Sequence, residues 1–169
     1  PAIISDTLIL KSPTCTHYDV DACQVLADIA GIDIEEYGRE MFRAGSNLSD
    51  KSEEEIFYRD YKKFSIGEIT VGVGQVNCMS QEEIEGLIKK EASYITSVTD
   101  KSDEINIAYL LLTDVMKETS YVMLSGKNAE QVLMQAFNID EITNNYVILP
   151  GVVSRKKQFL PAIVEVLQQ

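Results

Sequence analysis

Three consecutive cations near the C-terminus are the residues of this chain best suited to chemistry. They lie in Ser154-Arg155-Lys156-Lys157-Gln158, between an apolar run at 146–149 and a pattern with helical spacing at 158–167. An arginine can donate two parallel hydrogen bonds, a lysine acts as a point charge, and the first turn of a helix has free backbone N–H groups. The segment therefore suits phosphate oxygens. The alternative is a helix start whose cations are simply solvated. However, each cation at a helix N-terminus interacts unfavourably with the helix dipole, at a cost of about 0.3–1 kcal/mol.

The charge of the whole chain narrows the kind of phosphate compound. The sequence contains 27 acidic and 15 basic residues, which gives a formal net charge of −12 at pH 7. Such a surface repels a polyanion, so we expect no nucleic-acid partner. A small phosphate ligand, held in a pocket with focused positive potential, agrees better with this composition.

Composition also indicates a cytoplasmic protein with no membrane partner. The 169 residues, 45% of them hydrophobic, suit one domain, or one domain with a piece of another. No apolar stretch approaches the roughly 20 residues that cross a bilayer, and no basic segment precedes the apolar residues 1–10 as in a signal peptide. Cys15, Cys23 and Cys78 are scattered without a Cys-x-x-Cys pair, so we expect reduced thiols and neither disulfides nor a zinc site.

The first ten residues indicate that the chain is part of a larger protein. There is no initiator methionine, and the segment 1–10 opens with apolar residues that lack a helix cap and need a partner. A natural domain start is more often polar and frayed. We therefore expect a preceding segment.

The order of elements predicts an α/β fold. Two capped helices are expected first, from Thr16 to Gly31 and from Asp33 to Gly45, and the polar segment 46–52 is interpreted as a linker. Beyond it the patterns predict helices at 53–58, 80–95, 128–137 and 158–167, and strands at 61–66, 69–76, 105–112, 121–124 and 146–149. This order implies a mixed β-sheet with helices packed on it.

Several ordered motifs resemble one enzyme family over the whole chain. The segment 149–158 is similar to the signature near the C-terminus of family II inorganic pyrophosphatases, the manganese- or cobalt-dependent members of the DHH phosphoesterase superfamily. Further similar motifs lie at 2–8, 11–16, 27–31, 41–45, 60–64, 75–77 and 112–114. The resemblance implies three parts: the last two or three helices of a truncated DHH catalytic domain at 1–45, a linker and hinge at 46–52, and a complete C-terminal accessory domain at 53–169.

The resemblance also implies a role for four residues. Arg155 and Lys156 match the family's phosphate-binding pair, Lys62 matches its third cation, and Asp6 matches one carboxylate metal ligand. In that family two divalent metals activate the water that attacks pyrophosphate, and the accessory domain holds the phosphates. The implied cofactors are manganese or cobalt, with magnesium bound to the substrate.

The residues that are missing matter as much. The single histidine, His17, is not in a DHH motif, and one aspartate cannot hold two metals. We therefore expect no catalytic residue in this chain and no pyrophosphate hydrolysis by the chain alone. The expected partners are pyrophosphate and the DHH domain of the same protein. We expect the intact enzyme to be a homodimer, and a monomer stays open for the isolated chain.

Other candidate residues favour structural interpretations. His17 is expected at the surface, Arg43 near the linker, and the glycines of the segment 71–74 where another segment approaches closely. Asp114 suits either a turn or a site at a strand end. Two other functions stay open: a related phosphoesterase that acts on short polyphosphates, and a non-enzymatic module that senses an anion or mediates assembly.

Overall fold

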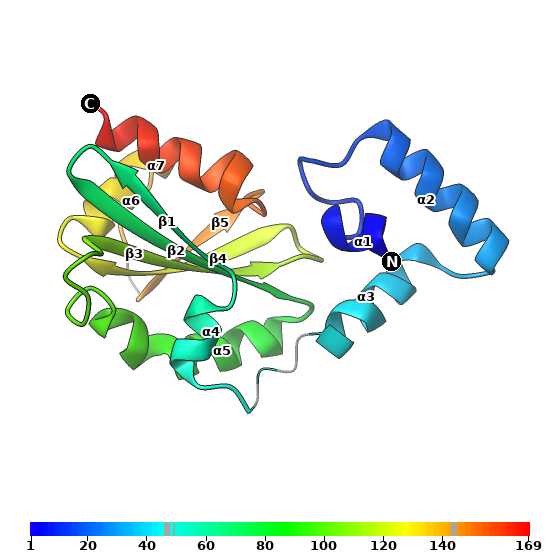
Figure 1. Cartoon of the computed structure of the whole chain (residues 1–169), viewed down its shortest axis with the longest axis horizontal. Coiled ribbons are helices and arrows are strands. Elements are labelled where there is room, and N and C mark those ends of the chain that lie inside the picture. Colours follow the sequence, from blue (N-terminus) through cyan, green and yellow to red (C-terminus); the bar gives the residue numbers. More distant parts are fainter. Residues whose placement is uncertain (46–47, 49, 143–144) are drawn as a thin grey trace.

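The structure is a computed structural model that describes residues 1–45, 48, 50–142 and 145–169, and three N-terminal helices stand beside an α/β unit in it (Figure 1). The N-terminal helices are α1 (Ala2–Asp6), α2 (His17–Ala30) and α3 (Ile34–Gly45). The helices of the α/β unit are α4 (Glu53–Tyr58), α5 (Gln81–Ser97), α6 (Ala129–Phe137), the π-helix η1 (Arg155–Phe159) and α7 (Leu160–Leu167). Its strands are β1 (Tyr61–Ile66), β2 (Ile69–Cys78), β3 (Ile107–Asp114), β4 (Thr119–Gly126) and β5 (Tyr146–Pro150).

The two predicted N-terminal helices are confirmed together with their caps. The Thr16 side chain accepts a hydrogen bond from the Asp19 N–H, and the Asp19 carboxylate accepts one from the Thr16 N–H, which is a capping box for α2. Gly31 ends this helix in the left-handed conformation, at φ 66°. The Asp33 carboxylate accepts from the Glu36 N–H at the start of α3. Local capping chemistry therefore determines where these helices begin and end.

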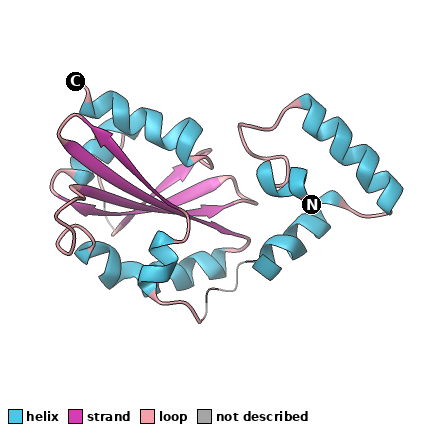
Figure 2. Ribbon diagram, in the orientation of Figure 1, coloured by secondary structure: helices cyan, strands magenta, loops and turns pink. Residues whose placement is uncertain are grey.

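The predicted mixed sheet is also confirmed. Its five strands have the order β1-β2-β3-β4-β5, with β2 and β3 parallel and the other neighbouring pairs antiparallel. The helices α4 and α5 cover one face, and α6 and α7 cover the other (Figure 2). Every residue of β3 is buried, as its continuous apolar run predicts. The sheet therefore has a core on each face.

The last helical region differs from the sequence-based prediction. It begins at Arg155 rather than at Gln158, because η1 precedes α7. The Ser154 carbonyl accepts from the N–H groups of both Gln158 (3.0 Å) and Phe159 (3.1 Å), which widens this turn. Pro161 follows in the first turn of α7, where a missing N–H costs little. The predicted cation segment is thus a π-helical turn.

The segment between α3 and α4 is partly described. Residues 46, 47 and 49 of the predicted linker lie outside the described residues. Leu48 packs into the core between the sheet and α5. The Lys90 ammonium on α5 donates to the carbonyls of Leu48 (3.3 Å) and Lys51 (2.5 Å). Leu48 and Lys51 therefore lie against α5, and the role of the segment as a hinge stays a prediction.

A buried carboxyl group on α5 gives a pH dependence to stability. Both Glu91 carboxyl oxygens are buried and lack a hydrogen-bond partner within the described structure. Burial raises the pKa of Glu91 to about 8; the nearby Glu53 acts in the same direction, and Lys90 opposes it. In the unfolded chain a glutamate has a pKa of ~4.3. The folded state therefore binds more protons between these values, so stability falls as pH rises through this window.

Glu91→Gln should remove this pH dependence. The neutral amide keeps the shape of the side chain and has no proton to lose, so we expect it to stabilise the protein at pH 8 by about 1–3 kcal/mol, because each unit of pKa difference between folded and unfolded chain is worth roughly 1.4 kcal/mol. The gain should shrink toward pH 5, where Glu91 is neutral. Urea unfolding at both pH values measures the difference. Glu85→Gln on an exposed position of the same helix is the control, and an equal gain at pH 5 and pH 8 would contradict the assignment.

Candidate functional site

A cavity of about 240 Å³ lies where the N-terminal helices meet the sheet. Asp6 at the end of α1 lines it from one side, and Arg155 and Lys156 of η1 line it from the other. The end of β2 contributes Gln75 and Asn77. Three of the four residues predicted from the sequence therefore share one cavity, in which the two cations come together with the carboxylates of Asp6 and Asp60.

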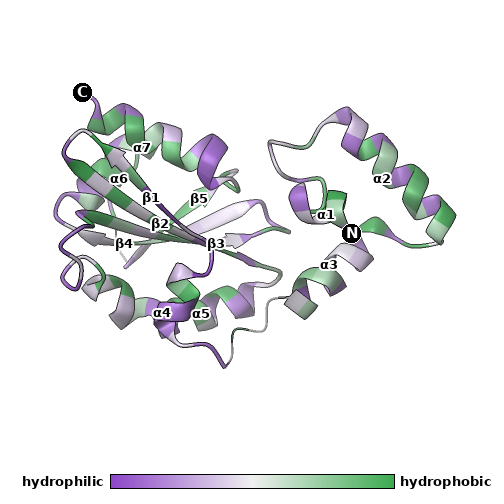
Figure 3. Cartoon of the chain, in the orientation of Figure 1, coloured by the Kyte–Doolittle hydropathy of each residue, from purple (hydrophilic) through white to green (hydrophobic). Residues whose placement is uncertain are grey.

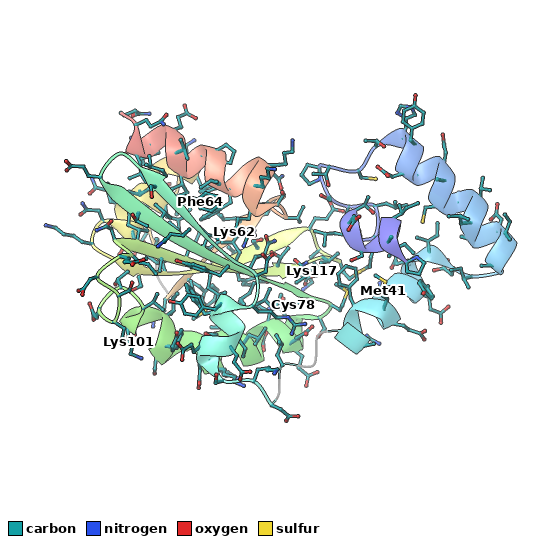
Figure 4. The ribbon with its side chains drawn as sticks, in the orientation of Figure 1. Met41, Lys62, Phe64, Cys78, Lys101 and Lys117 are labelled. Atoms are coloured by element: carbon teal, nitrogen blue, oxygen red, sulfur yellow. The ribbon has the colours of Figure 1, made fainter. Side chains whose placement is uncertain are left out.

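The fourth predicted residue, Lys62, is outside the lining of this cavity but lies near it. Lys62 pairs with Val73 across β1 and β2, and the Val73 carbonyl accepts a hydrogen bond from Arg155 (3.2 Å). Because side chains alternate along a strand, Lys62 shares a face with Phe64, which packs against the core cluster that includes Phe159 of η1. Figure 4 labels Lys62 and Phe64 on this strand. Lys62 is exposed, on the same side of the sheet as η1.

The Arg155 guanidinium is held firmly by the protein. Its side chain is only 10% exposed. Nη1 donates to the carbonyls of Asp60 and Val73, and Nη2 donates to the Asp60 carboxylate (2.8 Å). An arginine has further N–H donors beyond these three bonds. Arg155 is therefore oriented before any ligand binds and retains donors for ligand oxygens.

The neighbouring cations lie differently. Lys156 and Lys157 are both exposed, but only Lys156 is among the residues that line the cavity. Lys63 forms an ion pair with Glu104. Lys63 and Lys157, which the prediction leaves out of the site, are therefore absent from the lining of this cavity.

Gln158 holds the loop that carries the cations. Its side-chain oxygen accepts from the N–H groups of Val153 (2.9 Å) and Ser154 (3.0 Å), and its amide nitrogen donates to the Gly151 carbonyl (2.6 Å). The Ser154 hydroxyl accepts from the Lys157 N–H (3.2 Å). The sequence pattern included Gln158 in the basic segment without showing this role.

A row of polar side chains across three strands of the sheet also binds the loop before η1. Gln75 of β2 donates to Thr113 of β3 (3.1 Å) and to the Val153 carbonyl (3.1 Å). Thr113 shares a hydrogen bond with Ser120 of β4 (2.9 Å), and Ser120 donates to the Val152 carbonyl (2.7 Å). Sequence reasoning missed this row. A usable signal was a polar residue near the C-terminal end of β2 and of β3, and another at the start of β4.

The N-terminal helices contact the α/β unit directly, which places Asp6 opposite the cations. A small core joins them, formed by Ile4, Ile9, Cys23, Met79 and Val115. Lys11 forms an ion pair with Glu118 (3.2 Å), and Arg59 donates to the Gly45 carbonyl (2.7 Å). The cavity therefore depends on both parts of the chain.

Asn77 shows that the site has unused hydrogen-bonding capacity. Its side-chain oxygen is buried and has no hydrogen-bond partner within the described residues. Asn77 also lines a second cavity, of about 280 Å³, which shares Asp60 and Gln75 with the first. A buried acceptor without a donor is costly, so the site favours a bound water or a ligand group there.

Two expected surface or turn residues are found where the structural interpretations place them. His17 is exposed at the start of α2. Asp114 is buried at the end of β3, and its carboxylate accepts from the Lys117 N–H (2.9 Å), so it stabilises a turn.

Within the described part of the chain, the helices are too short or too polar to span a bilayer.

The described residues do not form a complete metal site. No group of three or more His, Cys, Asp or Glu side chains among them could hold a metal ion. Asp6 is exposed and lines the cavity, so its carboxylate could supply one oxygen ligand. Further ligands would have to come from groups beyond these residues.

Comparison with known families agrees with this arrangement. Residues 39–166 match the family model described as the DHHA2 domain. The chain belongs to the DHHA2 domain family. This match includes η1 and the whole sheet, and thus the cation side of the cavity.

Relatives of this DHHA2 chain are named as pyrophosphatases. It is 42% identical over 168 residues to the cobalt-dependent inorganic pyrophosphatase of Clostridium perfringens, covering 98% of the chain and 30% of that relative. It is 40% identical over 171 residues to the manganese-dependent inorganic pyrophosphatase of Bacillus subtilis, covering 99% and 53%.

A crystal structure supports the fold. A Methanococcus jannaschii protein assigned to the family II inorganic pyrophosphatases matches with a TM-score of 0.82 and 35% identity, covering 99% of this chain and 53% of that one. The chain thus spans about half the length of this protein and of the Bacillus subtilis relative.

Proposed function

We propose that this chain is the C-terminal, substrate-clamping part of an inorganic pyrophosphatase that depends on manganese or cobalt. Residues 1–45 would belong to its DHH domain, 46–52 would act as the hinge, and 53–169 would form the accessory domain. The observation that carries this proposal is the single cavity lined by Asp6 on one side and by Arg155 and Lys156 on the other.

The cations would grip the phosphate oxygens of pyrophosphate. Arg155 is oriented by three hydrogen bonds and would use its remaining donors, whereas Lys156 and Lys62 would act as point charges. Preorganised donors of this kind stabilise the charge that develops on phosphoryl oxygens. Asp6 would contribute one ligand to a metal centre that the DHH domain holds for the most part.

The surface of α2 supports a further partner domain. Tyr18, Leu26 and Ile29 of this helix are 73%, 58% and 78% exposed. Figure 3 shows hydrophobic (green) residues along α2, which lies apart from the sheet. Large exposed apolar side chains on one helix indicate that another protein surface packs against that helix. In this proposal the DHH domain of the same protein provides it.

Phosphate release tests the proposal directly. The chain alone, with manganese or cobalt and magnesium pyrophosphate, should give no turnover. Addition of a separately produced DHH domain should restore it. Lys156→Ala should weaken the restored activity by about tenfold, because a charge in the cavity is lost, and Lys157→Ala should not. Turnover by the chain alone would contradict the division of labour.

A further inference from the structure

Asp60 is the residue that ties Arg155 to the strand carrying Lys62. It lies between α4 and β1, two residues before Lys62. Its carbonyl accepts from Arg155 and from the Gln75 N–H (3.0 Å), and its carboxylate accepts from Arg155 Nη2 (2.8 Å). It lines both cavities, and its side chain is 56% exposed.

The charge of Asp60 is unexpected beside an anion site. A carboxylate repels a phosphate ligand in the same cavity, and the effect is larger where water is scarce. Its position is therefore explained by what it does to Arg155, which lies 95 residues away in the sequence. A carboxylate oxygen fixes a guanidinium plane by a short, directional, charge-assisted bond.

We propose that Asp60 is a positioning residue for pyrophosphate binding. It holds the plane of the Arg155 guanidinium, so that the unengaged N–H donors remain available to phosphate oxygens, and it fixes Arg155 relative to Lys62. This inference rests on the proposed function of the cavity. The competing hypothesis is that Asp60 occupies Arg155 and must be displaced by the substrate.

The two hypotheses predict opposite effects of Asp60→Ala on the affinity for imidodiphosphate. Titration of the chain with imidodiphosphate, followed by calorimetry, gives the dissociation constant of each variant. If Asp60 positions Arg155, Asp60→Ala should weaken binding by about fivefold or more, although it removes a repulsive charge. Asp60→Asn keeps an oxygen acceptor without the charge, and should bind within about threefold of the original chain or more tightly. Tighter binding by Asp60→Ala would overturn the proposal.

A matched control separates positioning from net charge. Glu104→Ala removes a carboxylate that forms an ion pair with Lys63, the residue after Lys62 on β1. Glu104 has no bond to Arg155. It should leave imidodiphosphate binding unchanged or slightly stronger. A loss equal to that of Asp60→Ala would show that fold stability, and not orientation, explains the effect, and would overturn the proposal.

A spectroscopic readout keeps the inference separate from the proposed function. The Nε–Hε signal of the Arg155 side chain should be sharp in the original chain and in Asp60→Asn, and should broaden or shift toward free arginine in Asp60→Ala. If the original chain does not bind imidodiphosphate at all, the proposed function fails, while this signal still decides whether Asp60 orients Arg155. An unchanged signal in Asp60→Ala would overturn the positioning role.

Discussion

Replacement of Arg155 with alanine is expected to lower pyrophosphate hydrolysis, after addition of a DHH domain, by about 100-fold or more. The guanidinium is 10% exposed and fixed by three hydrogen bonds, so in the proposed function it would meet the phosphate oxygens without a cost of reorganisation. Its loss removes charge-assisted bonds where water is scarce. It also leaves the Asp60 carboxylate unpaired beside an anion. Phosphate release under saturating and limiting magnesium pyrophosphate measures both effects.

Arg155→Lys is the informative companion variant. Lysine keeps the charge, but a single ammonium cannot donate to the two carbonyls and the carboxylate and also reach the ligand. We therefore expect it to recover only a small part of the activity. Thermal unfolding of both variants must show that the fold persists. Activity within about threefold of the original for Arg155→Ala would remove this residue from the binding site.

Local chemistry explains why so much of the fold was predictable. The capping boxes at Thr16 and at Ser52 each satisfy backbone N–H groups within a few residues, so the starts of α2 and α4 depend on neighbours in the sequence. The buried run in β3 is equally local, because both faces of a central strand are covered. Such features are visible without any tertiary information.

The rest of the site depends on contacts between distant residues. The bond from Arg155 to Asp60 joins positions 95 residues apart, and that from Gln75 to Val153 joins positions 78 apart. No period or spacing encodes these pairs, since they form only when the strands reach their register. The π-helical turn at Arg155 was not predicted for the same reason. This wide turn forms together with the preceding loop, which Gln158 holds in place. The resemblance pointed to the cations but not to their supports.

The glycines of β2 connect the sequence, the fold and the site. The prediction that they allow a close approach of another segment is confirmed. A Cβ on Gly74 would lie 2.6 Å from the Phe57 carbonyl oxygen, and a Cβ on Gly72 would lie 2.5 Å from the Tyr61 hydroxyl. The first contact is with backbone, which cannot rotate away, whereas the second is with the end of a side chain. Gly74 is therefore the stricter requirement.

Gly74→Ala should consequently destabilise the protein by about 3 kcal/mol, the upper range for overpacking a core. Urea unfolding measures this loss, and Gly86→Ala is the matched control. Gly86 lies in α5 with nothing within 4 Å of its added Cβ, so alanine there should stabilise by about 0.5–1 kcal/mol. A cost below about 1 kcal/mol for Gly74→Ala would show that α4 adjusts easily.

The same substitution should also disturb the proposed phosphate site. Phe57 lies in α4, three residues before Asp60, and the Asp60 carbonyl accepts from the N–H of Gln75, the residue after Gly74. A methyl group that pushes α4 away from β2 therefore shifts Asp60, and with it the anchor of the Arg155 guanidinium. We expect Gly74→Ala to weaken imidodiphosphate binding even at temperatures where the variant is fully folded. Unchanged binding by the folded variant would show that Asp60 keeps its place independently of α4.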